Sequence, residues 1–384
     1  MRAVAVVLCA GACAGAGDDI GREPGEPLRD LTEVELGRFL LGKAVFERLT
    51  TAEEGLGPLY NEKRCSSCHD HPASGGSSTK LVTKATRFEG GVCDLLVNQG
   101  GDNIQQVATP LLVAHGILRE VIPASATDSA RVIGPPLFGS GLVETIADET
   151  ILALEDPDDA DGNGISGRVG RTADGRVGRF SRKSDVATVF DFIETALRFE
   201  LGLTTPMNPM EETVNGVALP PDVDPMSDPE IDERGMGILT DFVRFLAPPA
   251  REYLFPAAAD SVADGERLFE EVRCASCHVP SLSSGPNEVA ALAGQTVHLY
   301  SDLLIHDMGP ALGDVCGPNA EPSEYQTARL WGLRHRERFL HDGRATNVRD
   351  AILTHDGEGA GARDAFAALT PDEQQLLLRF LASL

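Results

Sequence analysis

Two similar stretches of the chain carry apolar residues at helical spacing. Residues 37–47 read GRFLLGKAVFE, and residues 264–270 read DGERLFE. Apolar side chains three and four positions apart form one face of an α-helix. Thr32 and Glu35 have the spacing of a capping box ahead of the first stretch. The pattern therefore predicts a helix at the start of each of two related halves.

Both halves also end on an apolar helical pattern. Residues 241–247 close the first half before a Pro-Pro pair at 248–249, and residues 377–382 close the second. Thr370, followed by proline and two acids, is expected to cap the last helix. Proline ends a helix, so the domain boundary is predicted at about residues 248–260.

The first half is longer than the second because of a segment that runs roughly over residues 90–229. Within it, residues 134–141 predict a loop and residues 185–201 predict a helix. Strand signals are few. We expect a mainly α fold with long loops and two domains, residues 28–249 and 260–384, the first enlarged by an insertion.

The chain is strongly acidic, with a formal net charge of −26 over 384 residues. A negative surface repels phosphates, so nucleic acid is not expected as a partner. The charge would attract basic soluble partners such as small electron carriers, or it would only keep the protein soluble.

The N-terminus has the pattern of an export signal. Residues 3–16 are apolar, follow Met1-Arg2 and precede two aspartates. They are too few to span a bilayer but suit a signal peptide over residues 1–17, which predicts a periplasmic or otherwise exported protein. Cys13 follows Ala-Gly-Ala, which loosely resembles a lipoprotein box without its usual leucine, so a lipid anchor at Cys13 is the alternative.

A C-x-x-C-H motif occurs twice, as CSSCH at 65–69 and as CASCH at 274–278. Two thiols one helical turn apart can add to the two vinyl groups of a porphyrin, and the next histidine reaches the iron. With 8 Cys and 9 His in the chain, about 0.004 copies are expected by chance. The motif predicts two covalently bound haem c groups, held by Cys65, Cys68, His69, Cys274, Cys277 and His278.

Paired cysteines also occur in zinc sites and in redox disulfides. The gap between the two motifs is too long for a zinc ribbon, and each pair is followed at once by histidine. A thioredoxin-like dithiol would lack the preceding helix and the histidine. Haem is therefore the preferred reading, with zinc and a redox dithiol as alternatives.

The sixth ligand of each iron decides between an electron carrier and an enzyme. A second strong ligand makes an electron carrier, whereas an open position lets a small oxidant reach the iron. The candidates are the remaining histidines and several methionines: His71, His115, His298, His306, His335, His341 and His355. A lone histidine is more often an ordinary hydrogen-bonded residue than a ligand.

Three further segments resemble a known superfamily. They are LWGLRHRERFLHDGR at 330–344, YSDLLIHDMGP at 300–310 and PLFGSGLVE at 136–144. Together they are similar to the bacterial dihaem cytochrome c peroxidase and MauG superfamily, and most of all to its dihaem oxidoreductase branch. The resemblance covers nearly the whole mature chain and implies two cytochrome c-like domains whose haems face the interdomain region.

The same resemblance implies the sixth ligand of the C-terminal haem. In that superfamily it lies on the helix after the His-Asp-Gly turn, where this chain has His355 instead of the usual methionine. A bis-histidine haem of His278 and His355 should have a lower potential, because imidazole favours ferric iron. The alternative ligand is Met308.

The N-terminal haem would then be the catalytic one. Peroxidases of the superfamily have a distal glutamate that moves a proton between the peroxide oxygens, and Glu144 is the candidate here. In the other reading Glu144 is a helix-start acid beside Asp148 and Glu149. His71 and His115 remain candidates for the sixth ligand, although an open site is favoured.

An acidic loop resembles the opening of a calcium-binding loop. Asp159, Asp161 and Asn163 alternate along the chain before glycine, but position twelve of the loop is Gly170 instead of glutamate. The sequence therefore predicts either a calcium site or an acidic surface turn.

Two other features complete the set of expectations. Cys93 and Cys316 remain outside the motifs and are expected either to form a disulfide or to stay as separate buried thiols. Trp331, the only tryptophan, would pack against a haem pocket or relay electrons between haems.

These expectations define an exported dihaem oxidoreductase that resembles peroxidases. Electrons would enter from a small electron-donor protein or cytochrome at the C-terminal haem, and an oxidant such as hydrogen peroxide would be reduced at the N-terminal haem. The alternatives are a non-catalytic dihaem electron-transfer protein and a calcium-stabilised binding protein with structural haems.

Overall fold

A computed structural model describes residues 20–252 and 259–384. The expected signal peptide over residues 1–17 and the anchor residue Cys13 lie outside the described residues. No helix in the described part of the chain is long and apolar enough to cross a membrane.

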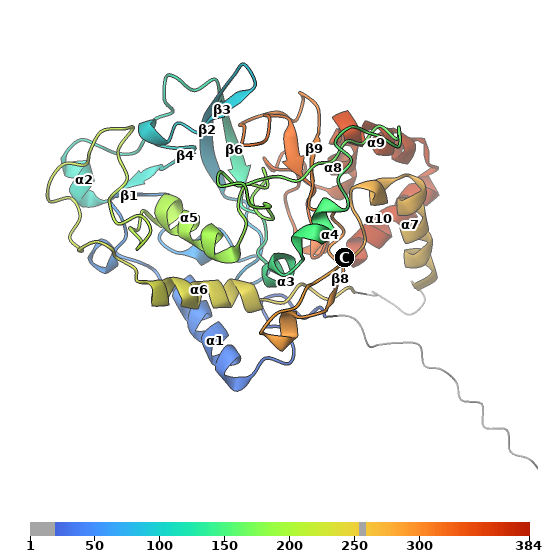
Figure 1. The fold of residues 1–384 in the computed structure, drawn as a ribbon, viewed down its shortest axis with the longest axis horizontal. Coiled ribbons are helices and arrows are strands. Elements are labelled where there is room, and N and C mark those ends of the chain that lie inside the picture. The colour runs from blue at the N-terminus through green and yellow to red at the C-terminus, as the bar shows by residue number, and fades with distance from the viewer. Residues whose placement is uncertain (1–19, 253–258) are drawn as a thin grey trace, which may run out of the picture.

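Two pairs of helices frame the molecule (Figure 1). Helix α1 (Glu33–Glu47) packs against α6 (Glu233–Phe245), and α7 (Ala259–Glu271) packs against α10 (Pro371–Ser383). Helices α1 and α10 both start with a capping box, in which the side chain of Thr32 or Thr370 accepts a hydrogen bond from the third helical residue. The helices predicted at both ends of each half are confirmed.

Each helix pair crosses at a glycine. A Cβ atom on Gly42 would lie 2.3 Å from a backbone oxygen of α6 and 2.7 Å from the Cβ of Phe242. A Cβ atom on Gly265 would lie 2.2 Å from a backbone oxygen of α10 and 2.8 Å from the Cβ of Phe380. No side chain fits at either crossing, so glycine allows both pairs to pack this closely.

The insertion contains a four-stranded antiparallel sheet that the sequence analysis did not predict. Its central strand β2 (Leu81–Glu89) pairs with β6 (Asp128–Ile133), β3 (Val92–Asp94) and β4 (Asn103–Ile104). Strand β2 has no regular alternation of buried and exposed residues, which is the signal that marks a strand in a sequence. The fold is therefore mainly helical, with a small sheet.

The remaining elements are short and are joined by long loops. Residues 134–141 form the predicted loop as far as Gly139, after which α3 begins, and the predicted helix at 185–201 starts at Val189. The other helices are α2 (Pro110–Ala114), α3 (Ser140–Glu144), α4 (Asp148–Leu152), α5 (Val189–Leu201), α8 (Val348–Thr354) and α9 (Ala360–Ala368). The other antiparallel strand pairs are β1 (Leu59–Tyr60) with β5 (Val107–Ala108), β7 (Leu282–Ser283) with β8 (Thr296–Val297), and β9 (Ile305–Asp307) with β10 (Glu324–Gln326).

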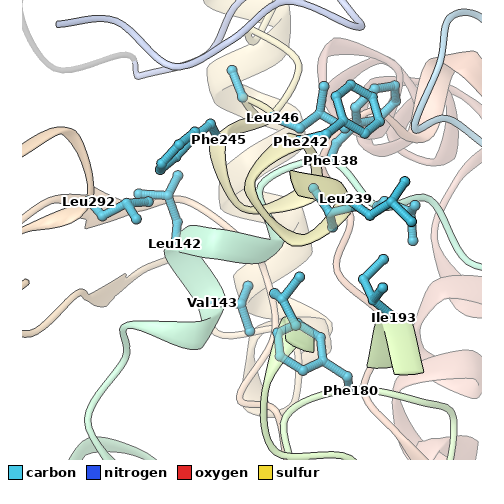
Figure 2. Close-up of a cluster of buried hydrophobic side chains, with 14 of the residues drawn as sticks. Phe138, Leu142, Val143, Phe180, Ile193, Leu239, Phe242, Phe245, Leu246 and Leu292 are labelled. Atoms are coloured by element: carbon cyan, nitrogen blue, oxygen red, sulfur yellow. The ribbon is translucent and has the colours of Figure 1, made fainter. Parts of the chain in front are cut away.

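The larger hydrophobic core lies where α3, α5 and α6 meet (Figure 2). Phe242 and Phe245 of α6 pack there with Leu142 and with Leu292, which comes from the second half of the chain. A second core lies between α7 and α10 and includes Phe269, Phe366, Leu377 and Phe380. Because residues of the second half enter the first core, the two halves share apolar surface, and the domain limits remain a prediction.

A disulfide joins Cys93 of β3 to Cys316, with a Cα–Cα distance of 5.8 Å. The predicted pairing of these two cysteines is confirmed. The bond fixes the sheet of the insertion to the C-terminal part of the chain.

Candidate haem-binding sites

Each C-x-x-C-H motif forms one turn of 3₁₀-helix. The turns cover Cys65–Ser67 and Cys274–Ser276, and the second cysteine of each donates its N–H to the carbonyl of the first, at 3.1 Å and 3.4 Å. A single turn brings both sulfurs to one side of the backbone and leaves the histidine directly after it. Thioether attachment to the two vinyl groups of one porphyrin needs this arrangement.

The cysteines of the motifs are partly buried. Burial raises the pKa of the Cys65, Cys68 and Cys274 thiols to about 12. A redox-active dithiol depends on a lowered thiol pKa, so this environment does not fit a thioredoxin-like function. Among the described residues, Cys277 has ligand atoms of Asp302 and His306 within 4.8 Å, whereas Cys65 and Cys68 are in no such group, although a zinc site at the first motif would require one.

The helix crossings place the same aromatic residue behind each motif histidine. Phe46 lies four residues after Gly42, and its ring centroid is 6.4 Å from that of His69. Phe269 lies four residues after the glycine of the second crossing, and its ring centroid is 6.3 Å from that of His278. The repeated Gly-x-x-x-Phe pattern in the sequence therefore marks two equivalent sites.

Three histidines have Nδ1 hydrogen-bonded to a backbone carbonyl. The partner oxygens belong to Gly76 for His69 (3.3 Å), to Tyr300 for His278 (2.9 Å) and to Ala351 for His355 (2.8 Å). Such a bond fixes the tautomer and leaves Nε2 as the metal-binding atom. Burial lowers the pKa of His69 and of His278 to about 4, so both rings are neutral at neutral pH, as iron coordination requires.

Other histidines are engaged differently. His306 bonds Glu358 through Nδ1 (2.7 Å) and Asp302 through Nε2 (2.9 Å). Burial alone would lower the pKa of His306, but hydrogen bonds to Asp302, Cys277 and Glu358 raise it to about 12. A protonated imidazole with both nitrogens bonded has no free electron pair for iron, so His306 is not a ligand in this arrangement.

His71 and His115, the two candidates for the sixth ligand at the first site, are both exposed. His115 lies at the end of α2. His71 lines a polar cavity of about 270 Å³ beside the first motif, with its Nε2 4.0 Å from a Glu337 carboxylate oxygen. The structure brings neither histidine into a described contact with His69.

The structure brings His355 and Met308 to the same part of the second site. His355 follows α8, and the charge of a protonated His355 would lower the pKa of His278. A Cβ atom on Gly359 would lie 3.1 Å from the Met308 methyl group and 3.2 Å from the Cβ of His355. Met308 and His355 therefore lie close to each other.

Glu144 has no described contact with His69. As the last residue of α3, it accepts hydrogen bonds from Arg244 Nε (2.5 Å) and Nη2 (3.0 Å) and from the N–H of Val189 (2.8 Å). The carboxylate thereby joins α3 to α6 and to the start of α5. These contacts give Glu144 a structural role and leave its catalytic role a prediction.

The acidic loop gathers a different set of side chains than expected. One carboxylate oxygen from each of Asp156, Asp159 and Asp161 lies within 4.8 Å of the others. The side-chain amide of Asn163 instead donates a hydrogen bond to Asp161 (2.7 Å). Asp156 thus joins the predicted Asp159 and Asp161, and Asn163 contacts the group through Asp161.

The structure also brings together residues that the sequence analysis did not select. Arg182, Arg329 and Arg336 are partly buried near the first motif, and Trp331 packs in the larger core. Arginine has no diagnostic spacing, and Arg182 is distant in sequence from the other two. The described contacts of Trp331 fit pocket packing better than a separate relay.

The sequence and the fold were compared with known proteins. The family model described as "Di-haem oxidoreductase, putative peroxidase" matches residues 125–384. No curated protein matches the chain.

Three solved structures that resemble the chain are distant in sequence. Hydrazine synthase from Kuenenia stuttgartiensis is 13% identical with a TM-score of 0.42, and the match covers 100% of both chains. A MauG-like protein associated with microbial copper homeostasis is 15% identical with a TM-score of 0.41, covering 95% of this chain and 92% of that one. The diheme peroxidase BthA from Burkholderia thailandensis is 16% identical with a TM-score of 0.35, covering 94% and 93%.

Proposed function

Because the chain belongs to the di-haem oxidoreductase family, we propose that it is an exported dihaem c-type cytochrome that reduces an oxidant such as hydrogen peroxide. Thioether bonds from Cys65, Cys68, Cys274 and Cys277 would hold the two haems. When bound, the haems supply one-electron redox chemistry that no side chain of the protein offers.

One observation carries the proposal. Each C-x-x-C turn is followed by a partly buried histidine whose Nδ1 is bonded to a carbonyl and whose ring lies near a phenylalanine of the helix crossing. Residues that only stabilised the fold would not need the same two cysteines and one histidine at both places. His69 and His278 would each bind a haem iron through Nε2.

The two sites differ in the residues that could complete them. His355 has the same Nδ1 arrangement as the motif histidines, and its charge would lower the pKa of His278, which supports His355 as a second histidine for the C-terminal haem. Among the described residues, no additional histidine with this arrangement occurs at the first site. We therefore assign electron entry to the second site and oxidant binding to the first.

The overall reaction balances with an external donor. Hydrogen peroxide takes up two electrons and two protons, its O–O bond breaks, and two water molecules leave. The electrons come from a small electron-donor protein or cytochrome, and the acidic surface would attract a basic one. Glu144 is the residue predicted from the sequence to transfer the proton. Its carboxylate would have to break its ion pair with Arg244 to do so.

Two smaller proposals accompany this function. Residues 1–17 would direct export to the periplasm, with lipidation at Cys13 as the alternative. Calcium would bind at Asp159 and Asp161, with Asp156 as the third carboxylate.

The ferric protein's optical and EPR spectra test the function, taken with and without one equivalent of reductant. We expect one low-spin haem and one haem that is high-spin or becomes accessible to small ligands, together with peroxide-dependent oxidation of a reduced cytochrome. Two haems that stay low-spin and do not react with peroxide would instead identify an electron-transfer protein. A colourless mature chain would overturn both.

A further inference from the structure

Two arginine side chains contact the loop that faces His69. Arg182 Nη2 donates to the carbonyl of Ile133 (2.6 Å), and Arg329 Nη2 lies 3.4 Å from the carbonyl of Pro136. Ile133 and Pro136 flank Gly134, where a Cβ atom would lie 3.0 Å from the imidazole of His69. The arginines therefore hold both sides of the turn that contacts the first motif histidine.

The third arginine connects to the second through the backbone. Arg336 Nη2 donates to the carbonyl of Arg329 (2.7 Å) and approaches that of Trp331 (3.4 Å). The guanidinium of Arg329 also lies 5.7 Å from the centroid of the Trp331 ring. These contacts place Arg329, Arg336 and Trp331 in one cluster.

The cluster concentrates positive charge without a carboxylate partner. Among the described residues, the three arginines hydrogen-bond to backbone carbonyls and to the Ser140 hydroxyl, and to no carboxylate. Burial lowers the pKa of Arg182 and of Arg329 to about 10. Burial, followed by the charges of Arg329 and Arg182, lowers the pKa of Arg336 to about 9.

The two acidic residues whose charges act on Arg182 are already paired with other side chains. Asp314 and Asp342 raise the pKa of Arg182 from a distance. Asp314 is bonded to His341 (2.9 Å), and Asp342 to Arg344 (2.5 Å). Several like charges in a partly buried site destabilise the fold unless an anion binds between them.

Several buried donors of the cluster have no acceptor. In the described part of the chain, Arg182 Nε, Arg336 Nε and Trp331 Nε1 are shielded from solvent and have no hydrogen-bond partner. All three atoms can only donate, so a ligand that satisfies them must bring acceptor oxygens. Carboxylate groups suit the forked geometry of arginine.

We propose that Arg182, Arg329 and Arg336, with the indole N–H of Trp331, form a carboxylate site for the propionate groups of the haem at His69. The inference rests on the proposed function only in requiring haem at the first motif. It adds that the second half of the chain supplies most of the charge that balances a cofactor attached to the first half.

The site would control the reduction potential of that haem. Nearby cations favour the reduced iron, which carries one positive charge less, and they keep the propionates ionised. Loss of an arginine should therefore lower the potential of the His69 haem. It should also make that potential depend on pH near neutrality, because the propionate pKa would rise into that range.

The experiment is a spectroelectrochemical titration of the holoprotein at several pH values, with the two haems followed separately. Arg329→Met and Arg336→Met are the test variants, Arg329→Lys is the charge-conserving variant, and Arg338→Met is the control, because Arg338 is an exposed arginine of the same segment. We expect a lower, pH-dependent potential for the His69 haem in the two test variants. We also expect recovery with lysine and no change in the control.

Other outcomes would overturn the inference. One is an unchanged reduction potential of the His69 haem in folded Arg329→Met and Arg336→Met, and another is a shift confined to the potential of the His278 haem. The third is stabilisation of the wild-type holoprotein by added inorganic phosphate, which would indicate a site for a free anion. Should Arg329→Met fail to fold, Arg336→Gln and Arg329→Lys provide the same comparison. Failure of the proposed function appears differently, as absent haem or absent peroxide reactivity in the wild type.

Discussion

At the scale of single residues, the histidine hydrogen bonds separate ligands from structural side chains. A histidine that binds iron through Nε2 is commonly held by an acceptor at Nδ1, and His69, His278 and His355 satisfy this condition with backbone carbonyls. His306 and His341 instead bond carboxylates through Nε2. The hydrogen bonds therefore favour His69, His278 and His355 as ligands over His306 and His341.

Replacing His355 tests the second site. His355→Ala should turn the C-terminal haem high-spin, and His355→Met should raise its potential by on the order of 0.1 V, a part of the range that axial ligands cover. The ferric optical and EPR spectra provide the measurement, with His298→Ala as control because His298 is exposed. A low-spin signal that persists in His355→Ala but is lost in Met308→Leu would assign the ligand to Met308.

Glu144 can be tested against its ion-pair partner. Glu144→Gln should lower the free energy of unfolding by about 1–2 kcal/mol, because the Glu144–Arg244 pair is largely but not completely shielded. Arg244→Gln breaks the same pair and keeps the carboxylate. A peroxide turnover that falls about 100-fold only in Glu144→Gln, at equal amounts of folded protein, would support the catalytic role. Equal losses in both variants would assign the residue to structure alone.

A separate carboxylate cluster predicts how stability depends on pH. Burial, followed by the charges of Glu230, Asp224 and Asp228, raises the pKa of Glu211 from 4.5 to about 9, and burial raises that of Glu230 to about 7. The folded state thus holds these protons more tightly than the unfolded state, so stability should fall as pH rises from about 4.5 through 9.

The matching variant is Glu211→Gln. Near pH 8 it should raise the free energy of unfolding by on the order of 1 kcal/mol, and the melting temperature should rise with it. The effect is of this modest size because Glu211 is partly exposed. Stability should also depend less on pH than in the wild type. Thermal unfolding with a chelator present measures this, and the exposed Glu53→Gln is the control. A lower melting temperature, together with stabilisation of the wild type by added calcium, would contradict the prediction and indicate a cation site.

At the scale of elements, the two helix crossings depend on glycine. Gly42→Ala should destabilise the protein by at least about 2 kcal/mol, because the new methyl group meets the backbone of α6. Gly37, in the same helix, has nothing within 4 Å of its Cβ position. Gly37→Ala should therefore stabilise by about 0.5–1 kcal/mol. Denaturant unfolding measures both changes. Equal effects would show that helix propensity, and not the close contact at the crossing, determines the change in stability.

Local patterns account for what the sequence predicts well. The capping boxes at Thr32 and Thr370 and the two C-x-x-C-H turns need only residues a few positions apart. The hairpin of β2 and β3 has a local signal in Gly90-Gly91 that the prediction did not use. The pairing of β2 with β4 and β6 joins residues farther apart, and β2 lacks a regular alternation. The arginine cluster was missed because Arg182 is distant in sequence from Arg329 and Arg336.

At the scale of the whole molecule, the two halves hold each other in place by several kinds of contact. The larger core includes Leu292 and Trp331 from the second half. Ser166 of the insertion donates to the carboxylate of Glu358 through its N–H (3.0 Å) and its hydroxyl (2.9 Å). Such contacts would keep the two haem sites at a fixed separation, which electron transfer between them requires.

The disulfide should contribute strongly to stability. Cys93 and Cys316 are 223 residues apart in sequence, and the entropy of a loop of that length predicts about 5 kcal/mol in favour of the folded state, as an upper estimate. The Cys93→Ser/Cys316→Ser variant should melt well below the wild type. Thermal unfolding with and without reductant checks this, since reductant should change only the wild type. Identical melting of both proteins would contradict it.

The bond between Cys93 and Cys316 also decides whether the fragments separate after a protease cleaves the chain. One C-x-x-C-H motif precedes residue 93 and the other precedes residue 316. A chain nicked anywhere between residues 93 and 274 would place the two motifs on different fragments that stay covalently tied. Such a digest would run as a single haem-stained band on a non-reducing gel, and a thiol reagent would resolve it into two coloured pieces.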